Sequence, residues 1–196
     1  TGVENTIIGG LAGDSLTTGA RNIAIGHGAL GSANGTESRN TAIGWSALAV
    51  LDADGNGYNT AVGYNAGAGI TTAVNNTLIG GLSGDAITTG GDNVSLGYNS
   101  LTSNTIGNSN VAIGKDSMLT NVAADRNVAI GLGTLQNMTA ASTSDTYNTA
   151  MGYAAGHAIT SGTLNTVIGG LAGDALTTGS SNVAIGCEAL TTEDTT

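Results

Sequence analysis

One pattern of polar and apolar positions recurs along the whole chain. Segment 22–30, Asn-Ile-Ala-Ile-Gly-His-Gly-Ala-Leu, is its clearest copy. An Asn begins each of eleven copies, at Asn5, Asn22, Asn40, Asn59, Asn76, Asn93, Asn110, Asn127, Asn148, Asn165 and Asn182. Successive Asn residues are mostly 17 residues apart, with single spacings of 18, 19 and 21. A period this regular is typical of a solenoid, in which each repeat forms one coil.

The apolar positions within a repeat predict a short strand. With the leading Asn as position zero, position one is always β-branched and position three is a large aliphatic residue or Met. Position four is always Gly, which indicates a turn or a left-handed backbone angle. In coil two, the strand is Ile23–Ile25 and the glycine is Gly26. We therefore predict an all-β fold, a parallel β-solenoid (β-roll) of about eleven coils of ~17 residues, as one domain over 1–196.

Position eight shows a coupled substitution. It is Leu or Met in six copies and Gly in five, and each of these glycines is followed three residues later by Leu or Ile. The pairs are Gly13 and Leu16, Gly67 and Ile70, Gly84 and Ile87, Gly156 and Ile159, and Gly173 and Leu176. An empty Leu-sized slot costs roughly 2–5 kcal/mol. We predict one interior slot per coil, filled from either side of a bend.

Composition and charge exclude several classes of partner. Four basic residues against fourteen acidic ones give a net charge of −10, which repels nucleic acid and anionic lipid. No apolar run approaches the ~20 residues of a membrane-spanning helix, so we expect no membrane insertion by this segment. Neither end carries the polar capping sequence usual in solenoids. That favours a segment of a longer fibre, or a subunit that stacks end to end.

Self-association is expected for a second reason. Each coil carries few large aliphatic residues, while ordering a residue costs on the order of 1.5 kcal/mol. Positions two and four are mostly Ala and Gly, which leave a smooth strip where another backbone could approach. We predict that this Ala/Gly strip is the subunit interface of a homotrimer.

The repeat also carries a family resemblance. Asn-Val-Ala-Ile-Gly, followed by two variable residues and then Ala or Ser, as in segment 182–189, resembles the head repeat of YadA-type trimeric autotransporter adhesins, and variants of it cover all eleven coils. The resemblance implies a homotrimer of left-handed parallel β-rolls, displayed on a bacterial surface to bind host or environmental matrix. Asn-Thr-Ala-Val-Gly-Tyr, found here at 59–64, is similar to repeats of phage tail fibres.

These observations lead to a non-enzymatic extracellular fibre module, an adhesin head that binds a surface or matrix ligand. The alternatives are a shaft or receptor-binding segment of a phage tail fibre, and a subunit of a self-assembling structural filament. The location would be a bacterial cell surface or a virion. No catalytic set is recognisable, because His27 and His157 are far apart in the coil order and Cys187 has no His nearby in sequence.

One group of residues has the composition of a binding surface. Position five holds His27, Trp45 and Tyr64 in three successive coils, where stacked strands would place them about 4.8 Å apart. Arg21 and Arg39 precede the Asn of coils two and three, and we expect them at the rim. Aromatic and Arg residues are enriched in binding hot spots. The partner would be an extracellular matrix protein or a neutral glycan. The alternative is a solvated ladder that stiffens the roll.

Coil three contains an insertion with a calcium-like pattern. Asp52, Asp54 and Asn56 alternate along the segment Asp-Ala-Asp-Gly-Asn-Gly, so their oxygens could converge on one hard cation. The pattern is half a calcium loop, since Gly63 stands where the bidentate Glu is expected. The two readings are a calcium site and an Asx-turn insertion.

Overall fold

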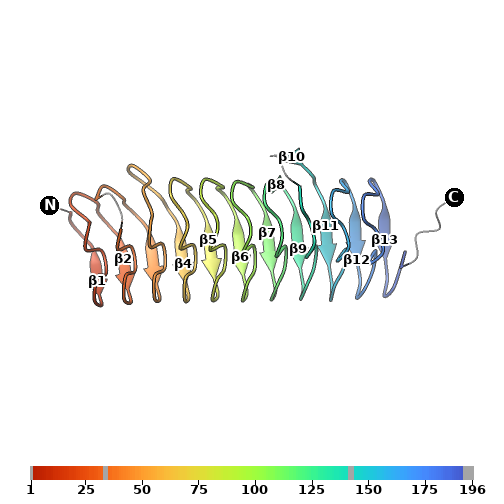
Figure 1. The fold of residues 1–196 in the computed structure, drawn as a ribbon, viewed down its shortest axis with the longest axis horizontal. Coiled ribbons are helices and arrows are strands. Elements are labelled where there is room, and N and C mark those ends of the chain that lie inside the picture. Colours follow the sequence, from red (N-terminus) through yellow and green to blue (C-terminus); the bar gives the residue numbers. More distant parts are fainter. Residues whose placement is uncertain (1, 33–34, 141–143, 192–196) are drawn as a thin grey trace.

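Eleven short strands lie side by side along an elongated rod, one from each repeat (Figure 1). The computed structural model describes residues 2–32, 35–140 and 144–191. The strands of the sheet are β1 (Thr6–Ile8), β2 (Ile23–Ile25), β3 (Thr41–Ile43), β4 (Thr60–Val62), β5 (Thr77–Ile79), β6 (Val94–Leu96), β7 (Val111–Ile113), β9 (Val128–Ile130), β11 (Thr149–Met151), β12 (Thr166–Ile168) and β13 (Val183–Ile185). All pair in parallel with the neighbouring coil, which confirms the predicted all-β parallel solenoid.

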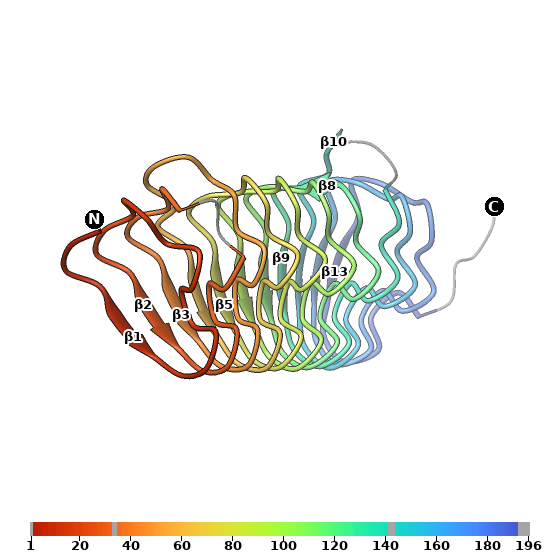
Figure 2. The same cartoon turned by 60° about the vertical axis from the view of Figure 1, so that its left-hand side comes forward.

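The sheet is in register throughout. Each strand covers positions one to three, and equal positions pair, as Thr77 does with Val94 and Ile79 with Leu96. Every repeat position therefore forms one column along the rod, and the coils nest in one another when seen at an angle to the axis (Figure 2). A second, two-stranded sheet joins β8 (Ala124–Asp125) to β10 (Ser144–Asp145). β10 ends the insertion of coil eight, residues 138–145, of which residues 141–143 lie outside the described residues.

The side chains at position two point into the coil. Ala24, Ala42 and Ala112 are fully buried, whereas Val94 and Leu96, at positions one and three, are 37% and 44% exposed. Ser83, at position seven of coil five, donates to the Ser95 hydroxyl at 2.8 Å, so columns two and seven face each other across the interior. The predicted Ala/Gly interface strip is therefore wrong. Its alanines line the core, and its glycines pack against the backbone of the next coil.

The coupled interior slot is confirmed. A Cβ built on Gly84 would lie 2.7 Å from Cδ1 of Ile87, so the Ile side chain already occupies the space. Two coils go further than predicted, because they bury an apolar side chain on both sides of the bend. These are Leu48 with Leu51, and Leu135 with Met138. Both coils carry the insertions, whose first residues therefore belong to the core.

A ladder of Asn side chains at position zero runs through the rod. The backbone N–H of Asn110 donates to Oδ1 of Asn93 at 3.0 Å, and Oδ1 of Asn110 accepts from the N–H of Asn127 at 3.0 Å. Nδ2 of Asn110 donates to the carbonyl of Ala124 at 2.9 Å. These buried amides satisfy backbone groups where the chain enters each strand. The sequence marked the Asn column as the start of the repeat, but not as this ladder.

Each coil also holds its backbone in the left-handed region at fixed positions. In coil seven these are Ser109, Asp116 and Met118, with φ of 58°, 56° and 49°, and the position-four glycine Gly114 has φ of 128°. The left-handed conformation costs a residue with a side chain roughly 1–2 kcal/mol. The coil can hold these angles only because the coils on either side bond to it.

The glycine column gives a direct test. A Cβ on Gly97 would lie 2.6 Å from the carbonyl oxygen of Gly114, and its φ is +143°, whereas a Cβ on Gly170 meets nothing within 4 Å. We expect Gly97→Ala to cost at least about 3 kcal/mol, which lowers the Tm by roughly 6–12 °C in a chain of this length. Gly170→Ala should shift it by no more than about 2 °C. Thermal unfolding followed by circular dichroism measures both, and equal effects would contradict the proposed role of the column.

Candidate functional site

Position five forms an exposed column just after the strands. His27 and Trp45 stack as predicted, with ring centroids 4.3 Å apart and an interplanar angle of 16°. Tyr64 is exposed at the same position of the next coil. The in-register sheet fixes this arrangement, because β2 ends two residues before His27 and β3 ends two residues before Trp45.

The two arginines lie at the opposite end of the strands. Arg21 and His27 flank β2, and an extended segment of six residues spans up to roughly 20 Å. Arg21 pairs with Glu4, Nε to Oε2, at 2.6 Å. The guanidinium of Arg39 lies over the ring of Tyr58, 5.6 Å from its centroid. The structure therefore brings His27 and Trp45 together but does not place the arginines at their rim.

Two hollows of similar build lie along the position-five column. The first, the coil-two hollow, has a volume of about 250 Å³ and is lined by Leu11, Asp14, His27, Gly28, Gly31, Ser32, Trp45, Ser46 and Ala49. The second, the coil-nine hollow, has a volume of about 280 Å³ and is lined by Leu132, Gly133, Gln136, Tyr153, Ala154, His157, Leu171 and Asp174. In both, the lining comes from positions five, six and nine of three successive coils, apart from Ser32 at position ten.

A missing side chain explains where the hollows lie. Among the eleven repeats, position six is Gly only at Gly28 and Gly133, and each hollow contains one of these two glycines. The side chains of positions five and nine form the walls on either side. Each hollow also has a carboxylate at position nine, Asp14 in the first and Asp174 in the second. Gly28 lies in the middle coil of the first hollow, whereas Gly133 lies in the first of the three coils that line the second.

Sequence reasoning found part of the first hollow and none of the second. His27 and Trp45 were identified from their residue types, while Leu11, Asp14 and Ser46 complete the lining. Ser46 follows Trp45 directly, whereas Leu11 and Asp14 belong to coil one and reach the hollow only because coils one to three stack on one another. The feature of the sequence that could have indicated each hollow is a Gly at position six, which only Gly28 and Gly133 provide.

The chemistry of the hollows suits a ligand with one apolar face and several hydroxyl groups. An exposed ring supplies a flat surface, and Asp, Ser, His or Gln side chains supply hydrogen bonds around it. The acidic residue in each hollow and the net charge of −10 disfavour anionic ligands.

Asp85 also stands at position nine of its coil, but it lines neither hollow. Burial raises the pKa of its carboxyl group.

The coil-three loop presents its polar side chains outward. Asp52, Asp54 and Asn56 are exposed, and Oδ1 of Asp54 accepts a hydrogen bond from Oγ1 of Thr36 at 3.2 Å. A backbone bridge between Ser38 and Asn56 ties the loop to coil two. The described residues contain no group of three or more His, Cys, Asp or Glu side chains arranged to hold a metal ion. Calcium binding thus depends on two carboxylates and one amide, and it stays a prediction.

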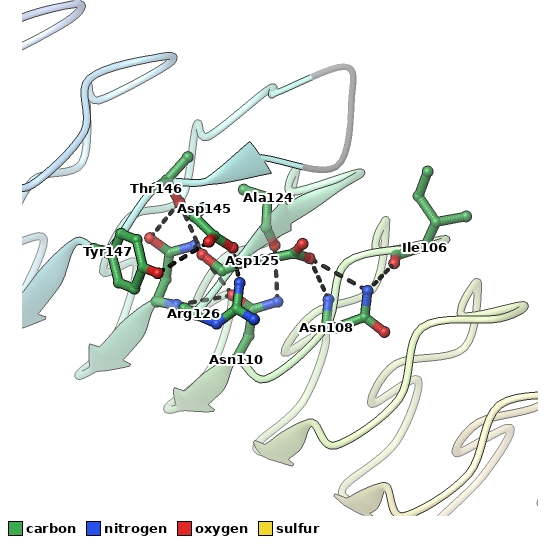
Figure 3. A network of polar contacts seen from close by, with 10 residues as sticks. Ile106, Asn108, Asn110, Ala124, Asp125, Arg126, Asp145, Thr146 and Tyr147 are labelled. Carbon is green, nitrogen blue, oxygen red and sulfur yellow. Dashed lines mark hydrogen bonds and ion pairs between the residues drawn. The ribbon is translucent and has the colours of Figure 1, made fainter.

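A polar cluster anchors the coil-eight insertion (Figure 3). Arg126 pairs with Asp145 and lies over the ring of Tyr147, whose hydroxyl donates to Oδ2 of Asp145 at 2.9 Å. Asp125 accepts from the backbone N–H of Asn108 at 2.6 Å. These bonds join the ends of β8 and β10 to the coils beside them. The cluster holds the insertion in place and lines neither hollow.

No protein-family model, curated protein or solved structure matches this chain. In the part of the chain that the structure describes, no helix is long and apolar enough to cross a membrane.

The calcium prediction can be tested by thermal unfolding. A calcium site of the extracellular type, with a Kd of about 1 mM, would stabilise the protein by about 1 kcal/mol at 5 mM calcium. We expect the Tm to rise by roughly 2–4 °C relative to EDTA. Asp52→Asn combined with Asp54→Asn should remove the rise, while magnesium at the same concentration should not reproduce it. An unchanged Tm would contradict the calcium prediction and favour the alternative, an Asx-turn insertion.

Proposed function

We propose that this chain is a non-enzymatic extracellular fibre module that assembles as a homotrimer and binds a surface or matrix ligand, as an adhesin head does. The observation that supports this most directly is the outer face of the eleven-stranded sheet. Position three is a large aliphatic residue or Met in every repeat, position one is Val, Ile or Thr, and neither position holds a charged residue in any repeat.

The outer face is larger than a free chain usually exposes. Eleven strands at about 4.8 Å form a strip roughly 50 Å long, with two columns of Val, Ile, Leu, Met and Thr. Contiguous apolar patches of more than a few hundred Å² mark interaction surfaces, and their burial contributes about 25 cal/mol per Å². A narrow flat face on each of three identical chains can meet at a common axis. The resemblance to YadA-type heads favours three chains over two.

The rod and its hollows favour an adhesin over the alternatives. A structural filament needs the outer face but no ligand site, whereas the coil-two hollow combines a stacked aromatic pair with a carboxylate. A phage tail-fibre segment would share the same rod and the same self-association. A stalk and membrane anchor encoded downstream would indicate an adhesin, while neighbouring baseplate genes would indicate a phage.

The outer face can be tested by placing charge on it. Val94→Lys with Leu96→Lys puts six ammonium groups into a trimer interface, so we expect monomers or loss of soluble assembly, because unpaired buried charges are costly. Val122→Lys is the matched control, since Val122 and Val94 are both 37% exposed and Val122 lies outside the sheet. Light scattering coupled to gel filtration measures the mass. A wild-type chain that is a stable folded monomer at micromolar concentration would contradict the proposal.

The coil-two hollow can be tested by removing its largest side chain. We expect Trp45→Ala to weaken binding to immobilised matrix proteins or neutral glycans at least tenfold, about 1.4 kcal/mol, with an unchanged Tm. Tyr98→Ala is the control, because Tyr98 stands in the same column with 52% exposure, against 53% for Trp45, and lines neither hollow. If both variants bind as the wild type does, the aromatic column is a structural ladder.

A further inference from the structure

The coil-nine hollow has features that the fold does not require. Tyr153 is 60% exposed and presents its ring at one wall, beside the apolar side chains of Leu132 and Leu171. Gln136 and His157, both half-buried, add polar groups. At about 280 Å³ the hollow is just below the range usual for drug-sized ligands, so it suits a single ring-sized group.

One polar atom of this hollow lacks a partner. Oδ1 of Asp174 is buried and accepts no hydrogen bond from the residues that the structure describes, although Asp174 lines the hollow. An unsatisfied buried acceptor costs about 1–3 kcal/mol, so this carboxylate is incompletely satisfied by the protein and would gain from a donor that a ligand brings to its side of the hollow. Oδ1 of Asp85 is equally buried and unpaired but borders neither hollow. An unpaired buried oxygen therefore does not indicate a ligand site by itself. At Asp174 it supports one, because Asp174 lines a hollow that also contains the exposed ring of Tyr153.

We propose that the coil-nine hollow binds one neutral hexose unit, packed on the ring of Tyr153 and hydrogen-bonded to Asp174. A pyranose has an apolar C–H face for the ring, and its hydroxyl groups can donate to the carboxylate and exchange hydrogen bonds with Gln136 and His157. The proposal rests on the proposed function only in giving the fibre module a second ligand site, separate from Trp45.

Charge and shape decide against other small ligands. Uronic and sialic acids would bring a carboxylate against Asp174 in a chain of net charge −10. A quaternary ammonium group would be attracted to Asp174, but such groups are held by cages of several aromatic rings, and Tyr153 is the one aromatic residue among the lining residues apart from the imidazole of His157. A neutral polyol uses the apolar wall and the polar groups together.

The experiment uses the full chain carrying Trp45→Ala, so that the coil-two hollow does not contribute. Methyl glucoside, methyl galactoside, methyl mannoside and N-acetylglucosamine serve as neutral probes, with glucuronate and choline as charged probes. Ligand-observed saturation-transfer NMR measures binding at millimolar concentrations. We expect at least one neutral probe to bind, and Tyr153→Ala and Asp174→Asn each to weaken it at least fivefold without changing the Tm. Asp85→Asn is the matched control and should leave binding unchanged.

Three results would overturn the proposal. They are no binding by any neutral probe, stronger binding of glucuronate or choline than of every neutral probe, and equal affinity in Asp174→Asn and the parent. Each is separable from failure of the proposed function. The trimer mass and the Trp45-dependent attachment of the otherwise unmodified chain are measured independently and would persist. If Tyr153→Ala lowers the Tm, the isosteric Asp174→Asn variant still decides the outcome.

Discussion

The close approach of each coil to the next is the constraint on which the rest of the structure depends. A coil contains no pair of strands of its own, so most of its backbone groups bond to the coils before and after it, as the N–H of Gly97 does to the carbonyl of Ile79. This spacing leaves no room for a Cβ at position four. It also imposes left-handed angles on residues such as Asp116 and Met118. One unfavourable backbone path is thus repeated in every coil because the stacking bonds compensate for it.

The repeat could be predicted in its period and its strands, but not in which face of the strand is the core. Short strands at positions one to three and a special backbone angle at position four follow directly from the residue types. The orientation was misjudged, because β-branched residues at Ile23 and Val94 are ordinarily read as core and Ala24 is not. A strand has a side-chain period of two, so this error exchanges the whole inner and outer faces. Small residues such as Ala24 and Ser95 fill the interior at position two in most coils, whereas Leu78 and Val167 are buried there in two coils that have Gly at position eight.

The candidate site shows the same limit. His27 and Trp45 were recognisable one at a time, since aromatic residues at an exposed position attract attention. The hollows, however, depend on a residue that is missing, and Gly28 and Gly133 look unremarkable in a chain with 33 glycines. Arg21 shows that closeness in sequence does not imply contact. It is near His27 in sequence, but the strand between them is extended and separates their side chains. Contacts in this fold follow the column, not the neighbourhood along the chain.

Because equal positions stack in columns, the number of coils between two points measures distance along the rod. Each added repeat lengthens it by one strand spacing, about 4.8 Å, and leaves both faces unchanged. The coil-two hollow is lined by coils one to three and the coil-nine hollow by coils eight to ten, so they are seven coils apart and roughly 34 Å separates them. The number of repeats between two sites therefore fixes the distance between them. Gain or loss of one 17-residue unit between the hollows would reset their separation in a single discrete step, while each hollow kept its own lining.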